Sequence, residues 1–294
     1  MDERLRNIRL DIAYDGTDFC GWQRQPGRLS VQASLERALK NVLGAGVRLV
    51  GSGRTDAGVH ATNQVANFST ESVIPLENLQ KALNNLLPPA VRITKVEAAA
   101  PHFHARHSAQ AKTYRYRILQ APVCPPHLSR FVFHYPFALD RVRMAQAARC
   151  LEGEHDFTSF AAAPGRRLNL NQARLVGAGI APPNPAPGRR LDANQAGGSP
   201  PELRNSAVRR IFSARILWRP RTSILSLEIR GNGFLHHMVR NIAGTLIEIG
   251  RGKIPPEEIS TILEARDRRF AGPTAPAQGL CLVRVEYEEN RVQG

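Results

Sequence analysis

The chain has 294 residues, enough for two domains of ordinary size, and 42% of them are hydrophobic, as is typical of a globular protein. The formal net charge of +15 and the isoelectric point near 10.7 favour a polyanionic partner, although a generic basic surface has the same composition. Neither a signal peptide nor an apolar run of membrane-spanning length is present, and the four cysteines form no Cys-x-x-Cys pair, so we expect a cytoplasmic protein without a zinc or redox motif.

The first hundred residues alternate between the patterns of strands and helices. A strand with apolar residues at every second position ends at Asp15-Gly16, and Ser30 is a plausible N-cap for a helix that ends at Gly44. Pro75 opens a second helix. The apolar runs that predict further strands cover residues 47–50, 64–68 and 91–96. The order strand, helix, strands, helix, strand is typical of a ferredoxin-like unit.

A glycine-rich turn over residues 51–60 presents Arg54 and Asp56 between two of these strands. It is not a P-loop, because Thr55 and Asp56 stand where Gly-Lys-Ser/Thr is required. It is not a dinucleotide-binding turn either, because the Asp56 carboxylate would repel a pyrophosphate. The turn therefore presents an acid beside a base, unless Asp56 only bonds its own backbone in an Asx turn.

Two segments after residue 100 combine aromatic and basic residues. His102, His104 and His107 suggest a metal, but their spacing matches no zinc pattern and no acid or cysteine completes a set. Residues 112–120 read as a strand with Tyr114 and Tyr116 on one face. These rings either stack nucleobases or belong to the core, and for Tyr116 the two possibilities remain equal.

The C-terminal part contains further strands and helices around a segment of different composition. Residues 161–206, rich in Pro, Gly and Arg, predict a flexible basic insert. A helix over 234–250 would place His236 and His237 about 100° apart, so that they cannot share a metal. In the helix expected over residues 139–151, the buried face should consist of Val142, Ala145, Ala148 and Leu151. The other expected elements are strands over 131–137, 208–211, 216–218, 224–230 and 279–285, and helices over 139–151 and 255–265.

The eleven residues 51–61, Gly-Ser-Gly-Arg-Thr-Asp-Ala-Gly-Val-His-Ala, closely resemble the active-site motif of the tRNA pseudouridine synthases that act on the anticodon arm. Further segments resemble this family in the same order: Gly21–Gln23, Phe103–Arg106, Asp156–Phe160 and Phe234–Gly244. The resemblance implies an α+β pseudouridine synthase fold. It would have two ferredoxin-like halves, residues 1–110 and 111–294, with a mostly antiparallel central sheet, flanking helices and a cleft between the halves.

The resemblance also implies an activity and roles for individual residues. The reaction would isomerise uridine to pseudouridine at positions 38 to 40 of tRNA, with no cofactor and no metal, and a homodimer would hold the tRNA. Asp56 matches the catalytic aspartate, Arg240 the arginine that pairs with it, Tyr114 the active-site tyrosine and Leu280 an apolar contact to the base. Arg54 matches the residue that enters the space of the flipped base. The expected RNA-contacting segment consists of Phe103, His104, Arg106 and His107.

Two other functions explain part of the sequence. A non-catalytic RNA-binding protein could use Tyr114 and Tyr116 as a stacking platform, but a carboxylate in a positive loop would weaken its binding to phosphates. A carboxylate-dependent nuclease would need several clustered acids to hold magnesium, and only Asp56 stands out.

Overall fold

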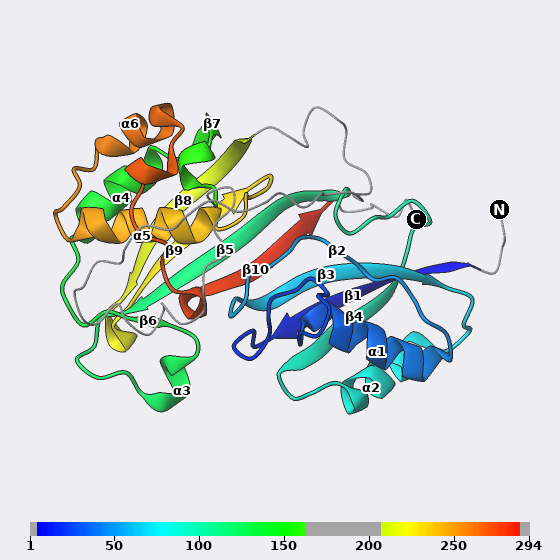
Figure 1. Cartoon of the computed structure of the whole chain (residues 1–294). Coiled ribbons are helices and arrows are strands. Elements are labelled where there is room, and N and C mark those ends of the chain that lie inside the picture. The colour runs from blue at the N-terminus through cyan, green and yellow to red at the C-terminus, as the bar shows by residue number, and fades with distance from the viewer. Residues whose placement is uncertain (1–4, 163–206, 289–294) are drawn as a thin grey trace, which may run out of the picture.

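The computed structural model describes residues 5–162 and 207–288. These residues form one mixed sheet in which eight strands follow the order β4-β1-β3-β10-β5-β9-β8-β7, while the short strands β2 and β6 pair with β3 and β5 (Figure 1). The expected insert lies outside the described residues, except for Ala161 and Ala162.

The N-terminal half has the strand order β4-β1-β3-β2, in which all neighbours are antiparallel. This is the order of a ferredoxin-like unit, as the alternation of strands and helices predicts. Ser30 caps the first helix by accepting a hydrogen bond from the Ala33 amide, and Gly44 ends it in the left-handed conformation, so both predicted ends are confirmed. The elements are β1 (Arg6–Tyr14), α1 (Val31–Leu43), β2 (Val50–Gly51), β3 (His60–Thr70), α2 (Leu76–Leu86) and β4 (Val91–Ala99).

The C-terminal half repeats the arrangement with the order β10-β5-β9-β8, and β7 extends its edge. The α+β fold with two ferredoxin-like halves is therefore confirmed. A domain boundary at residue 110 stays a prediction, and it falls inside β5. The elements are β5 (Ala109–Leu119), α3 (Pro126–Ser129), β6 (Phe133–His134), α4 (Arg141–Arg149), β7 (Gly153–Asp156), β8 (Val208–Arg219), β9 (Ile224–Gly231), α5 (Met238–Gly250), α6 (Glu258–Ala265) and β10 (Leu280–Tyr287).

The helices gather at the two ends of the sheet. Helices α1 and α2 lie together beside β1, β3 and β4, whereas α4, α5 and α6 lie together beside β8 and β9 (Figure 1). Strand β10 lies between the two halves and pairs in parallel with β3 through Cys281↔His60 and Leu282↔Ala61 alone. The later part of β3 pairs with β2 instead. The halves are therefore joined by a short stretch of sheet, next to the turn that connects β2 to β3.

Several expected elements differ in extent. The strand expected over 131–137 is only Phe133–His134, and α5 begins at Met238 instead of residue 234. The expected buried face of α4 is only partly correct, because Ala148 and Leu151 are buried but Val142 is 75% exposed, and Met144 and Ala147 are buried in its place. The helix is rotated so that Met144 packs on Gly250 of α5, a contact that the sequence pattern does not reveal.

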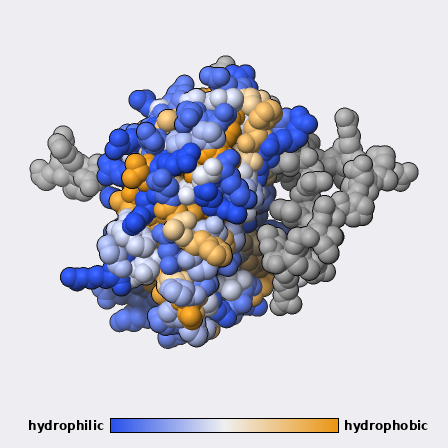
Figure 2. Space-filling model, turned by 90° about the vertical axis from the view of Figure 1, so that its left-hand side faces the viewer, coloured by the Kyte–Doolittle hydropathy of each residue, from blue (hydrophilic) through white to orange (hydrophobic). Residues whose placement is uncertain are grey.

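The described surface is mixed in polarity. Figure 2 views the end of the molecule that faces left in Figure 1, and it shows hydrophobic patches separated by hydrophilic side chains. Exposed Phe137, Val142 and Phe270 are examples from the C-terminal half. None of the described helices has the length and apolar character needed to cross a membrane.

A glycine allows α5 to pack directly against the loop that follows α6. A Cβ on Gly244 would lie 1.7 Å from the Pro273 carbonyl oxygen. The same loop is tied to the helix by the Ala275 amide, which donates to the Arg240 carbonyl at 3.1 Å. The position of α5, and with it Arg240, depends on this backbone contact.

We predict that Gly244→Ala destabilises the protein by about 2 kcal/mol or more, because the clash with backbone outweighs the better helix propensity of alanine. Gly46→Ala is the matched control: a Cβ on Gly46 would meet no atom within 4 Å, and its φ is not positive, so the change should stabilise by about 0.5 kcal/mol. Urea unfolding measures both. A Gly244→Ala protein as stable as the wild type would contradict this packing.

Candidate active site

The turn 52–59 that carries Asp56 is held by the loop after β1. The Trp22 amide donates to the Thr55 carbonyl at 3.1 Å, and the Gly58 amide donates to the Phe19 carbonyl at 3.3 Å. Such close approach requires glycine at position 21, which has φ +88° and whose Cβ would lie 2.6 Å from the Thr55 oxygen. The turn is thus fixed by backbone contacts, and it is more than a local Asx turn.

Trp22 is buried and supports the start of the turn. Its side chain is buried, and a Cβ on Gly51 would lie 2.6 Å from its indole ring. The structure therefore places Trp22 underneath the start of the turn.

The residues before α5 approach Asp56 from the other half of the protein. His237 precedes the helix with φ 61°, in the left-handed conformation, and the Ala162 amide donates to the His236 carbonyl at 2.9 Å. The expectation that these histidines point about 100° apart is wrong, because it assumed that they belong to the helix. Their ring centroids lie 3.9 Å apart, and both rings face Asp56.

Three basic side chains surround the Asp56 carboxylate, which is 17% exposed. His236 Nε2 lies 3.3 Å from Oδ1, and His237 Nε2 lies 3.6 Å from Oδ2. Arg240 Nη1 donates to Oδ2 at 3.4 Å, and its Nε donates to the Ala275 carbonyl at 2.8 Å, which fixes the guanidinium. The predicted proximity of Asp56 and Arg240 is therefore present.

These neighbours determine the charge of the carboxylate. Burial raises the pKa of Asp56, but the hydrogen bond to His236 and the charges of His237 and Arg240 outweigh it, so the net pKa is lower than usual. The same bond to Asp56 raises the pKa of His236. Burial lowers the pKa of His237 to about 4, so this ring is neutral at pH 7. Asp56 is therefore ionised across the physiological range.

The same three residues could also hold a metal ion. Asp56, His236 and His237 each offer one ligand atom, and these atoms lie within 4.8 Å of one another. The permanent charge of Arg240 on the same carboxylate opposes a cation there. The arrangement therefore suits control of the charge on Asp56 better than metal binding.

Tyr114 lies beside this group and Tyr116 lies in the core. Tyr114 is 7% exposed and packs edge-on against Phe234, with ring centroids 5.1 Å apart. Burial raises its pKa, and the nearby charge of Asp56 adds to the shift. Tyr116 is fully buried and donates to the Pro276 carbonyl at 2.9 Å, which settles the question that the sequence left open. Leu280, at the start of β10 and paired with Tyr116, is also buried.

The remaining predicted residues occupy two exposed segments. Arg54 is exposed on the turn, and its charge acts on His236. His104 and His107 stack with ring centroids 4.2 Å apart in the loop between β4 and β5, and Arg106 is exposed beside them. Phe103 packs against Tyr287 and is only partly exposed, so its ring contributes to the support of this loop.

The comparison with known proteins agrees with this geometry. The sequence model described as "tRNA pseudouridine synthase" matches residues 12–108 and 195–288, which is more than half of the chain. The chain belongs to the tRNA pseudouridine synthase family. Its relatives include the tRNA pseudouridine synthase A of Solibacter usitatus, 46% identical over 96% of this chain and 100% of that protein. Those of Caldicellulosiruptor saccharolyticus and Syntrophotalea carbinolica are both 40% identical, over 96% and 95% of this chain and 100% and 96% of theirs.

Sequence reasoning missed the two histidines as neighbours of the synthase-family aspartate. The available signal was the Gly231-Asn232-Gly233 turn, which allows the chain to remain irregular before the helix starts. The apolar residues Phe234, Leu235 and Met238 instead suggested that the helix begins earlier.

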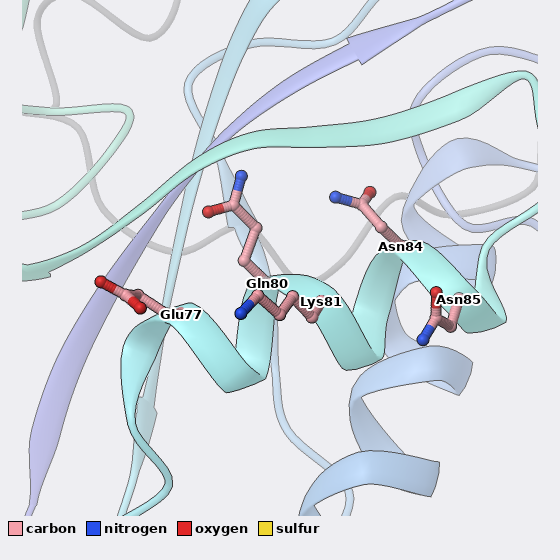
Figure 3. Close-up of a pocket in the computed structure, with 5 residues that line it drawn as sticks. All are labelled: Glu77, Gln80, Lys81, Asn84 and Asn85. Atoms are coloured by element: carbon pink, nitrogen blue, oxygen red, sulfur yellow. The ribbon is translucent and has the colours of Figure 1, made fainter.

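A hollow of about 650 Å³ lies on α2, away from the residues that gather around Asp56. Figure 3 shows that a single helix supplies its lining residues. Gln80 and Asn84 donate to the Ile93 carbonyl and so support β4. We assign it no role in the activity of this synthase-family protein. Its lining residues are Glu77, Gln80, Lys81, Asn84 and Asn85.

We predict that His236→Ala raises the pKa of Asp56, because it removes the hydrogen bond that most favours the ionised carboxylate. Carboxyl ¹³C NMR, with Asp56→Asn to assign the signal, measures the shift. His102→Ala, at an exposed histidine of the β4–β5 loop, is the control and should change nothing. An unchanged titration of Asp56 in His236→Ala would show that the histidine does not act on it.

Proposed function

We propose that this protein isomerises uridine to pseudouridine in the anticodon arm of tRNA, at positions 38 to 40. One observation carries the proposal: an ionised carboxylate, Asp56, lies at the junction of two ferredoxin-like halves, with Arg240 and Tyr114 around it. The relatives named tRNA pseudouridine synthase A support the same activity.

The reaction needs only groups that the site contains. The C1′–N1 bond of the nucleoside breaks, uracil turns, and a C1′–C5 bond forms. N1 gains a proton and the proton on C5 is lost to solvent, so no redox change occurs and no group is transferred to another molecule. Asp56 either attacks the base or ribose or removes a ribose proton, and both routes require it to be ionised. Arg240 keeps it ionised and fixes its direction.

Tyr114 and Leu280 suit contact with uracil. Both are largely buried, so they form the apolar floor on which a flipped base would lie. The phenol of Tyr114 stays protonated, because burial raises its pKa, and it can donate a hydrogen bond to the detached base.

The target base must leave its stack before it reaches Asp56, which costs a few kcal/mol. Arg54 is exposed on the turn, two residues before Asp56, which supports the proposal that its side chain occupies the vacated space. Arg106 would bring its positive charge, and His104 and His107 their ring nitrogens, to the phosphates, and Phe103 supports their loop. We further propose that two copies of the chain hold one tRNA and that the protein acts in the cytoplasm.

The two alternative functions, a non-catalytic RNA-binding protein and a nuclease, fit this geometry less well. A stacking platform made of Tyr114 and Tyr116 needs both rings exposed, but Tyr116 is 0% exposed. A magnesium-dependent nuclease needs clustered acids, whereas the ionisable neighbours of Asp56 among the described residues are histidines and Arg240.

We predict that Asp56→Asn still binds tRNA but loses tritium release from C5-labelled uridine by about four orders of magnitude. Glu248→Gln is the control, because Glu248 also pairs with an arginine, Arg251, near the C-terminal end of α5. It should retain wild-type activity. Full activity of Asp56→Asn, or label release that requires an added metal, would rule out the proposed reaction.

We also predict that Arg106→Gln lowers the salt dependence of tRNA binding, with the slope of log K against log salt reduced by about 0.7 to 0.9, the value of one phosphate contact. Lys81→Gln, on the exposed side of α2, should leave the slope unchanged. Filter binding between low and moderate salt measures both variants. Equal slopes for Arg106→Gln and the wild type would exclude Arg106 from the RNA surface.

A further inference from the structure

Lys112 lies on β5, two residues before Tyr114, and has no role in the steps described so far. Its Nζ donates to the Ser52 carbonyl at 2.6 Å. A Cβ on Gly53 would lie 3.1 Å from the same nitrogen, so the ammonium is in contact with the beginning of the Asp56 turn.

The other side of this segment is fixed from within the N-terminal half. The Ser52 amide donates to the Val65 carbonyl at 2.8 Å, and the Ser52 hydroxyl donates to Gln64 Oε1 at 2.6 Å. Gln64 Nε2 in turn donates to the Gly53 carbonyl at 3.0 Å. Lys112 belongs to the C-terminal half, so its bond connects the turn to the opposite half of the protein.

Side chains two positions apart on a strand share one face, so Lys112 and Tyr114 extend from the same side of β5. Lys112 holds the turn that carries Asp56, and Tyr114 lies beside Asp56. A single strand therefore sets the position of both the carboxylate and the ring that we expect under the base.

Keeping Lys112 protonated in this position costs free energy. Burial lowers its pKa to about 8, and the positive charges of Arg106 and Arg209 add to the shift. From β10, Tyr287 approaches Ser52, the residue that Lys112 binds, and burial raises the pKa of its phenol so that it remains neutral. Within residues 5–162 and 207–288, no carboxylate offsets these effects on Lys112. A neutral side chain would avoid this cost, so the positive charge points to a role for the ammonium itself.

We propose that Lys112 is a positioning residue whose protonated ammonium, by donating to the Ser52 carbonyl, holds the Asp56 turn in register with Tyr114. A hydrogen bond from a charged donor is about twice as strong as one from a neutral donor. The turn is therefore held best while Lys112 is protonated. This inference rests on the proposed function, because it concerns the geometry of the same reaction.

The proposal predicts that activity and stability change in opposite directions as the pH rises. The ordinary pKa of lysine, 10.5, applies to the unfolded chain, and the folded value is about 8. Between these values the unfolded chain binds more protons, so the stability contribution of this group rises with pH. The charge-assisted bond is lost over the same range, so activity should fall while stability rises. If Lys112 had only a structural role, activity and stability would change in the same direction with pH.

The test compares Lys112→Met and Lys112→Arg with the wild type, using Lys81→Met as an exposed control. We expect Lys112→Met to lower kcat about 10- to 100-fold with little change in KM for tRNA, because a misplaced carboxylate affects the chemical step. Lys112→Arg should restore most of kcat and should not show the wild-type fall in kcat/KM above pH 8. Amide exchange over residues 51–58 should become faster in Lys112→Met and not in Lys81→Met.

Lys112→Gln, which keeps a neutral donor, replaces Lys112→Met if the latter does not fold. Wild-type kcat and wild-type amide exchange in the neutral variant would overturn the proposal. A rise in KM alone, with a smaller salt slope, would also overturn it and would make Lys112 a phosphate contact. If the wild-type protein releases no tritium, the proposed function fails, and the exchange over residues 51–58 then decides the positioning role independently.

Discussion

The site depends on one ionic contact that spans the two halves of the protein. The Asp56 carboxylate is carried by the turn between β2 and β3, and Arg240 reaches it from α5 of the other half. The two halves share only two register pairs between β3 and β10, directly beside this turn. The carboxylate is therefore presented beside the junction of the two halves, and its basic partners His236, His237 and Arg240 come from the opposite half.

The balance of charge around Asp56 explains why several bases gather there. A carboxylate that is mostly buried favours its neutral form, and a fixed guanidinium at 3.4 Å compensates only in part. His236 supplies the hydrogen bond that tips the balance, and the His237 ring lies 3.6 Å from the same carboxylate. The immediate group carries little net charge, so in the proposed function the attraction for RNA falls to basic residues farther out, such as Arg54 and Arg106.

The sequence predicted most of this fold because the relevant signals are local. The alternation in β1, the Ser30 cap and the Gly44 end depend on neighbouring residues, and all were confirmed. The Asp56–Arg240 proximity was expected only from the family resemblance. The position of the histidines could not be predicted, because it depends on His237 adopting φ 61° and on the hydrogen bond from Ala162 to His236. Likewise, Val142 is exposed because α4 packs through Met144 on Gly250, a contact between distant segments.

Neither ferredoxin-like half can form this site by itself. The N-terminal half supplies Asp56 and the loop around Trp22 that supports it. The C-terminal half supplies Arg240, both histidines and Tyr114, and β10, the last strand of the chain, joins the two halves. Since β10 pairs with both β3 and β5, it fixes the separation between the turn that carries the carboxylate and the strand that carries the tyrosine. A chain that lacks β10 would lose one strand of the C-terminal half and the stretch of sheet that joins the halves, which would leave Asp56 without its charge partners in place.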